Sequence, residues 1–176
     1  MKNISKQTGV GLIEILVALL ILAVGVLGFI AMQYRAVEAT AEAINRVQAM
    51  NVARDLAERI RVNRAELNTY ITQAGNADTL SDVTVDCIGV ASANKCSSDE
   101  VANFDVKQVK QKAAELGMTI NMLPCSGNND GRNCIYVAWG DTSATDNASS
   151  EPAGTGDCTY GTSYNPASTC LIMETY

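Results

Sequence analysis

A single carboxylate, Glu14, lies inside an apolar stretch near the start of the chain. Residues 10–32 are otherwise apolar or glycine. A charge inside a membrane helix costs roughly 2.5–3.5 kcal/mol at the helix centre and less near its end. One interpretation is that Glu14 extends to the membrane interface. The other is that it pairs with an amine, which a cut between Gly9 and Val10 would create one helical turn away, on this molecule or on a neighbour. The stretch would then be an assembly element as well as an anchor.

Cysteines are the second group of residues that could do chemistry. All six lie well beyond the apolar stretch, and an even number placed there indicates disulfides in an oxidising compartment. Sequence alone does not select one connectivity, but the spacing suggests three local pairs, each closing a loop worth about 2–3 kcal/mol. A metal site is disfavoured because no C-x-x-C pair is present. The predicted pairs are Cys87–Cys96, Cys125–Cys134 and Cys158–Cys170.

Composition argues against other kinds of site. The chain has no histidine, so a Ser-His-Asp or Cys-His catalytic site is impossible and a zinc site would need thiolates and carboxylates alone. Its net charge of −6 disfavours binding to phosphate backbones. Acidic residues are interleaved with the basic group Arg54, Arg59, Arg61 and Arg64, so we interpret this group as a solvated or subunit-facing surface. We expect a protein that is not an enzyme and that uses no cofactor, no metal and no nucleic acid.

The element that must position Glu14 is a long N-terminal helix. As a helix, residues 10–32 would be about 35 Å long, which is enough to cross a bilayer. The apolar run is also longer than the roughly 7–15 apolar residues of a secretory signal. No proline occurs between residues 1 and 123, and good helix formers continue, so we predict an unbroken helix to about Thr72. The predicted segments are a leader at 1–9, a transmembrane half at 10–32, an amphipathic half at 33–72 and a globular head at 73–176.

The amphipathic half carries two apolar stripes on different faces. We expect the later stripe to pack onto the head and the earlier one to face neighbouring subunits. Arg59 follows Asp55 by four residues, a spacing that supports a helix by a few tenths of a kcal/mol. The later stripe comprises Ala49, Ala53, Leu56, Ile60 and Leu67, and the earlier one comprises Val37, Ala41 and Ile44.

The sequence of the head predicts a mixture of short helices, strands and loops. We predict a short strand at Val83–Val85 and a helix at Ala102–Leu116 that Gly117 ends. Strands at Thr119–Leu123 and Cys134–Trp139 flank a stretch dense in turn residues and so form a hairpin. Residues 140–157 contain no large apolar side chain and are expected to be a solvated loop. Cys170–Tyr176 would close the sheet as an edge strand, which gives an α+β fold.

The N-terminal motif resembles the signal of a known family. Gly9 followed by VGLIE and a long apolar helix is similar to the prepilin signal of type IV pilins and of type II secretion pseudopilins. The resemblance implies that a prepilin peptidase cuts after Gly9 and methylates the new amino terminus at Val10. It also implies that Glu14 helps to recruit the subunit by meeting a neighbour's amino terminus. Val10 departs from the phenylalanine or methionine of most members.

A second resemblance covers about the first 70 residues. The runs Leu16–Gln33 and Ala49–Leu67, the latter containing DLAERIRVNR, look like the minor pilins of the pilus modification (PilV-like) class. This implies the type IV pilin fold: a long N-terminal helix packed on a small antiparallel sheet domain with disulfides.

The implied function is that of a minor pilin in a system used for adhesion and twitching motility. Before assembly the subunit would be anchored in the Gram-negative inner membrane with its head in the periplasm. It would then join other minor pilins and the major pilin in a complex that primes fibre assembly near the tip. Two alternatives remain open: a type II secretion pseudopilin, and a membrane-anchored periplasmic ligand-binding domain.

Overall fold

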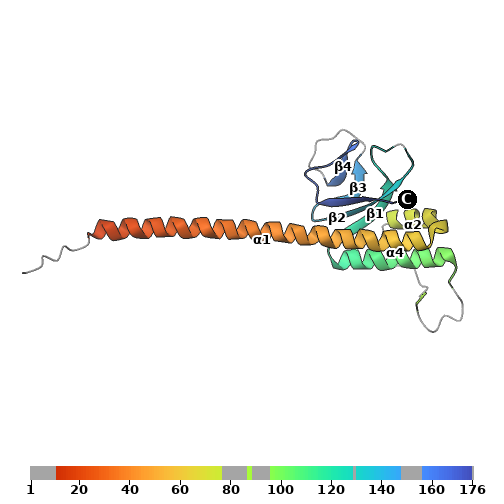
Figure 1. Cartoon of the computed structure of the whole chain (residues 1–176), viewed down its shortest axis with the longest axis horizontal. Helices are drawn as coiled ribbons and strands as arrows, with labels where there is room; N and C mark the ends of the chain where they lie inside the picture. Colours follow the sequence, from red (N-terminus) through yellow and green to blue (C-terminus); the bar gives the residue numbers. More distant parts are fainter. Residues whose placement is uncertain (1–10, 77–86, 89–95, 129, 148–155, 176) are drawn as a thin grey trace, which may run out of the picture. The chain divides into compact units, whose positions relative to one another are not determined.

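The chain forms two compact units, each built around a different stretch of one helix. The computed structural model describes residues 11–76, 87–88, 96–128, 130–147 and 156–175. Unit 1 is Met1–Ala43 and unit 2 is Ile44–Tyr176. Helix α1 (Leu12–Val62) supplies the described part of unit 1 and the first element of unit 2 (Figure 1).

Helix α1 ends earlier than the sequence predicts. An unbroken helix to Thr72 is wrong: α1 stops at Val62, a short 3₁₀ helix, η1, covers Arg64–Glu66, and helix α2 covers Leu67–Gly75. The break lies at Asn63, whose φ of −122° and ψ of 51° are not helical. Its side-chain Nδ2 donates a hydrogen bond of 2.7 Å to the carbonyl oxygen of Ser98. Asparagine readily trades helical geometry for such contacts, so the chain can bend here without proline or glycine.

Helix α4 (Ser98–Glu115) confirms the predicted second helix and starts four residues before the predicted Ala102. A capping box explains the earlier start, since Glu100 accepts hydrogen bonds from the backbone and hydroxyl of Ser97. The helix ends before Gly117, whose φ of +69° suits a residue without a side chain.

The first sheet is antiparallel and has the order β1-β2-β6. Its strands are β1 (Met118–Pro124), β2 (Asn133–Trp139) and β6 (Cys170–Glu174). The register pairs Ile120 with Val137, and Val137 with Leu171. The predicted hairpin and the C-terminal edge strand are therefore confirmed.

A second sheet lies partly where we expected a solvated loop. It contains β3 (Ser143–Asn147), β4 (Asp157–Tyr160) and β5 (Ser163–Tyr164), with β3 parallel to β4 and β4 antiparallel to β5. The loop prediction is wrong for residues 143–147. Ala144 of β3 is buried in a small core that also contains Tyr136 and Ala138 of β2. The predicted strand Val83–Val85 lies outside the described residues.

Strand β2 separates two apolar cores. The larger core joins the predicted stripe of α1 to α2, α4 and the face of β2 that carries Ile135, Val137 and Trp139. The smaller core contains Tyr136 and Ala138 from the opposite face. Side chains of successive strand residues point to opposite faces, so burial of both faces makes β2 the centre of the head. The long helix, the small sheets and the disulfides together confirm the predicted α+β fold.

Candidate functional site

The apolar part of α1 exposes its side chains within unit 1. Leu12 is 83% exposed, Leu22 is 63% exposed and Phe29 is 62% exposed. In the described part of the chain, α1 is the one helix whose length and composition would allow it to cross a membrane, and its most apolar 18 residues have a mean hydropathy of 3.0. Apolar surface in water is unfavourable by about 25 cal/mol per Å², so a stretch this large needs lipid or other helices around it.

Glu14 belongs to the first turn of this helix. Its backbone N–H donates a hydrogen bond of 2.9 Å to the carbonyl oxygen of Gly11. A carboxylate in the first turn also suits the partial positive charge of a helix N-terminus. The predicted cleavage site, Gly9 and Val10, lies outside the described residues, so cleavage and methylation stay predictions.

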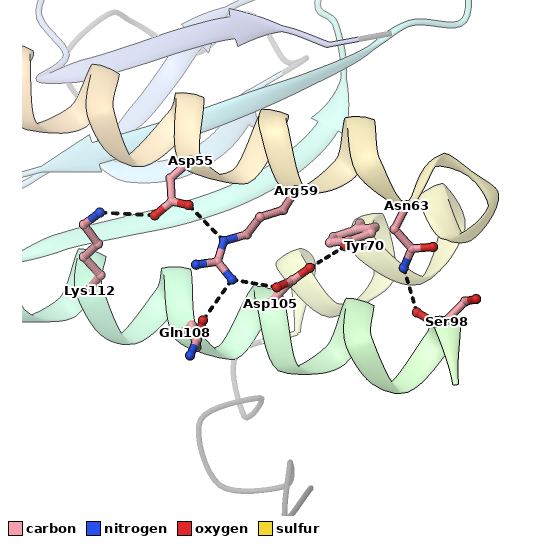
Figure 2. A network of polar contacts seen from close by, with 8 residues as sticks. All are labelled: Asp55, Arg59, Asn63, Tyr70, Ser98, Asp105, Gln108 and Lys112. Atoms are coloured by element: carbon pink, nitrogen blue, oxygen red, sulfur yellow. Dashed lines mark hydrogen bonds and ion pairs between the residues drawn. The ribbon is translucent and has the colours of Figure 1, made fainter. Parts of the chain in front are cut away.

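A polar network joins the helices of unit 2, and Arg59 is at its centre (Figure 2). Arg59 Nε donates to Asp55 Oδ1 at 2.8 Å within α1. Its Nη1 donates across to α4, to Asp105 Oδ1 at 2.6 Å and to Gln108 Oε1 at 2.9 Å. One guanidinium group therefore connects α1 to α4 through charge-assisted hydrogen bonds.

The network extends to α2 and along α4. Tyr70 donates its hydroxyl to Asp105 Oδ2 at 2.7 Å, and Lys112 Nζ donates to Asp55 Oδ2 at 3.1 Å. Burial acts to raise the pKa of Asp55, but hydrogen bonds from Arg59 and Lys112 outweigh it and hold this pKa below its ordinary value. Burial raises the pKa of Tyr70, and the hydrogen bond to Asp105 raises it further. Both shifts favour the protonation states present at neutral pH, so the network stabilises the head there.

This network corrects our interpretation of the basic group. Arg59 does not belong to a solvated surface, because its side chain is only 28% exposed and is held by two carboxylates. The spacing to Asp55 was a visible signal, and the four-residue pair forms. Sequence reasoning did not single out Asp105 or Tyr70. Tyr70 is itself a buried position of α2, and Asp105 directly precedes the buried Val106 of α4; these positions are the signal that could have found them.

The six cysteines form the three local disulfides that their spacing suggests: Cys87–Cys96, Cys125–Cys134 and Cys158–Cys170. The first closes a loop just before α4. The second bridges the two ends of the β1–β2 turn, and the third ties β4 to β6 in the smaller core. In the described part of the chain, no group of three or more Cys, Asp or Glu side chains is arranged to hold a metal ion.

Two turns meet beside these disulfides. Ser126 donates its hydroxyl to the carbonyl oxygen of Gly161 at 2.7 Å. Gly127 has a φ of +76°, and a Cβ there would lie 2.8 Å from the carbonyl oxygen of Thr162. Only glycine fits this close approach, which fixes the β1–β2 turn against the β4–β5 turn.

Comparison with known families gives one match. Residues 31–107 match the Tt1218-like family, described as type IV pilin Tt1218. No curated protein sequence and no solved structure gives a significant match to the chain. The matched region runs from the end of the apolar stretch through α1, η1 and α2 and into α4, so it contains Asp55, Arg59, Tyr70 and Asp105. By this match, residues 31–107 are similar to the Tt1218-like family of type IV pilins.

Proposed function

We propose that the protein is a minor type IV pilin that joins other minor pilins in a complex priming pilus assembly, near the fibre tip. The observation that carries the proposal is the combination of an exposed apolar helix in unit 1 with a disulfide-containing head in a chain that matches a pilin family. Before assembly the subunit is held in the inner membrane by α1, with its head in the periplasm. Afterwards it is part of the fibre.

Glu14 supplies the charge whose pairing favours assembly. In lipid its carboxylate costs free energy while it is unpaired. Cleavage after Gly9 gives each subunit a Val10 amine, and a neighbour's amine can then pair with Glu14. The pairing replaces an unfavourable contact with lipid by an ion pair between subunits. Assembly is therefore favoured only for chains whose leader has been removed.

The first test is the mature N-terminus. Mass spectrometry of the protein isolated from membranes should show a chain that starts at Val10 and carries one extra methyl group. A chain that still starts at Met1 would refute the proposal.

The second test replaces the carboxylate. We expect Glu14→Ala to keep membrane insertion and cleavage but to lose efficient incorporation into pili. Glu38→Ala is the matched control, because Glu38 is an exposed carboxylate of α1 beyond the apolar stretch. Normal piliation and normal pulldown of partner pilins by Glu14→Ala would contradict the mechanism.

Deletion of the gene separates a pilus subunit from a secretion pseudopilin. We expect the deletion strain to lose surface pili and to secrete proteins normally. Loss of secretion with normal pili would assign the chain to a type II secretion system.

A further inference from the structure

Strand β1 has an outer edge that faces away from β2, because β1 comes first in the sheet order β1-β2-β6. In an antiparallel pair, successive residues direct their backbone N–H and C=O groups alternately to the two sides of a strand. The N–H of Cys125, directly after β1, donates to the carbonyl oxygen of Arg132 at 2.9 Å. Odd-numbered residues of β1 therefore face β2. The even-numbered ones, among them Ile120, Met122 and Pro124, direct their backbone groups outward.

One half of this edge is blocked and the other half is open. The N–H of Met122 donates to the side-chain Oδ1 of Asn121 at 2.7 Å, and Pro124 has no N–H, so neither can donate to an added strand. In the described part of the chain, by contrast, no group hydrogen-bonds to the backbone N–H or C=O of Ile120. Ile120 is only 7% exposed, and unpaired backbone groups shielded from water cost free energy. A partner that brings both a donor and an acceptor would stabilise this position.

A pocket of about 330 Å³, here called the edge pocket, lies along the open half of the edge. Its lining includes Ile120 of β1, Ala74 of α2, Ala114 of α4 and Ala144 of β3. Helices α2 and α4 pack in the larger core on one face of the sheet, whereas Ala144 belongs to the smaller core on the other face. The edge pocket therefore lies where an added strand would continue the sheet between these two layers.

Lys110 of α4 is the one charged residue among the described residues that line the edge pocket. Its Nζ donates to the carbonyl oxygens of Gln73 at 2.9 Å and of Asn76 at 2.5 Å, at the end of α2. An ammonium group has three protons, so one remains for a further acceptor. Burial lowers the pKa of Lys110, and no carboxylate of the described residues counteracts this effect. The charge of the edge pocket therefore favours an acidic occupant.

We infer that the edge pocket is a docking site for an extended acidic segment of a different pilin subunit, which adds a strand beside β1. The backbone of the segment pairs with both the N–H and the C=O of Ile120. An Asp or Glu side chain of the segment accepts the third proton of Lys110. A small carboxylate fits less well, because it would leave the C=O of Ile120 unpaired. The inference rests on the proposed function, since a minor pilin must bind other pilins.

The test uses the full chain in cells that assemble pili. The photoreactive residue p-benzoyl-phenylalanine replaces Thr119, which is exposed on β1 and lines the edge pocket. Irradiation should crosslink it to a different pilin, and mass spectrometry should map the attachment beside an Asp or Glu of that pilin. Lys110→Met should lower the yield about tenfold or more, because the charge-assisted hydrogen bond is lost. Lys110→Arg keeps the charge and should retain most of the yield.

Controls separate docking from folding. Arg54→Met removes a positive charge that does not line the edge pocket, and it should leave the yield unchanged. Protease resistance equal to that of the unmodified chain shows that a Lys110 variant is folded. Neutralising the mapped acidic residue of the partner tests the same contact without any change in this chain, and it should lower the yield as Lys110→Met does. Equal yields with and without these two charges would overturn the inference.

The crosslinked segment, made as a peptide, tests the strand pairing itself. It should bind the purified full chain in detergent micelles. Methylation of the peptide nitrogen that donates to Ile120 should abolish binding, whereas methylation at the next residue, whose N–H points away from β1, should not. Equal effects of the two methylations would overturn the added strand.

A second crosslinking position separates failure of this inference from failure of the proposed function. The photoreactive residue at Val37, on the exposed part of α1, should crosslink to a pilin if the chain is a pilus subunit at all. Crosslinking at Val37 without crosslinking at Thr119 would overturn the docking site and leave the proposed function standing. Absence of crosslinks at both positions would overturn both. A crosslink from Thr119 within the same molecule, or to a second copy of this chain, would also overturn the inference.

Discussion

Asp105 accepts hydrogen bonds from two helices at once, and its replacement by asparagine tests the network directly. Arg59 donates to it from α1 at 2.6 Å, and Tyr70 donates from α2 at 2.7 Å. A hydrogen bond to a charged group contributes about 1.5–3 kcal/mol when it is well buried. The Asp105 side chain is 15% exposed and that of Arg59 is 28% exposed, so solvent screens part of this contribution. Asparagine keeps the shape and one acceptor, and we expect Asp105→Asn to lower the free energy of unfolding by about 1–2 kcal/mol.

The measurement is denaturant unfolding of the full chain in detergent micelles. Trp139 is the only tryptophan and lies in the larger core, so its fluorescence reports on the head. Tyr70→Phe removes one of the two hydrogen bonds and should cost about 1 kcal/mol. In that background Asp105→Asn should cost less than it does alone, with a coupling of about 0.5–1 kcal/mol. Glu115→Gln, an equal change of charge on an exposed part of α4, is the control and should stay within about 0.5 kcal/mol.

Two results would refute this reasoning. An effect of Asp105→Asn no larger than that of the control would mean that the network does not stabilise the head. Equal costs with and without the Tyr70 hydroxyl would mean that the two hydrogen bonds act independently of the shared carboxylate.

Three other perturbations have expected outcomes. Gly127→Ala should lower the free energy of unfolding by about 2 kcal/mol or more, because the new Cβ meets a carbonyl oxygen of the facing turn. Gly131→Ala should cost only about 1 kcal/mol, because Gly131 also has a positive φ (+71°) but has open space around it. Equal costs of the two variants in chemical unfolding would contradict the close approach at Gly127. Because the pKa of Tyr70 is raised in the folded head, stability should be full below pH about 10 and fall as pH rises above it, and Tyr70→Phe should remove part of that alkaline loss in fluorescence-monitored unfolding. Replacing Cys158 and Cys170 together by alanine should cost about 3 kcal/mol by loop entropy, and a loss below about 1 kcal/mol in the same assay would show that this bridge adds little.

The sequence predicts the parts of the fold that depend on apolar periodicity. The stripe of α1 from Ala49 to Ile60 is buried as expected, and alternation in β1 gives the correct strand and pairing. The end of α1 could not be predicted this way. Asn63 breaks the helix through one hydrogen bond to Ser98, a contact between residues 35 positions apart in the chain. Strand β3 was missed because its only apolar residue is Ala144, whose small side chain gives no periodic signal.

The candidate site was predictable where chemistry depends on local spacing. Glu14 lies in the first turn of α1, and each cysteine pair joins partners close in sequence. The network around Arg59 needed tertiary structure, because Asp105 is 46 residues away. The match to a pilin family covers residues 31–107, so the cleavage motif and Glu14 lie before it and depend on the resemblance alone.

The basic stretch of α1 shows why residue type alone could not assign these roles. A helix turns about 100° per residue, so residues that flank a buried stripe on opposite sides can be neighbours in sequence. Asp55 and Arg59 lie on the flank that faces α4, whereas Arg54 and Arg61 lie on the flank that faces β6. Charge reversal should therefore have different consequences on the two flanks. Reversal of Arg59 removes contacts to two carboxylates and should lower the free energy of unfolding, whereas reversal of Arg54 leaves the internal network intact and should change it by no more than about 0.5 kcal/mol. Equal losses of stability in denaturant unfolding of the two variants would contradict this assignment of the two flanks.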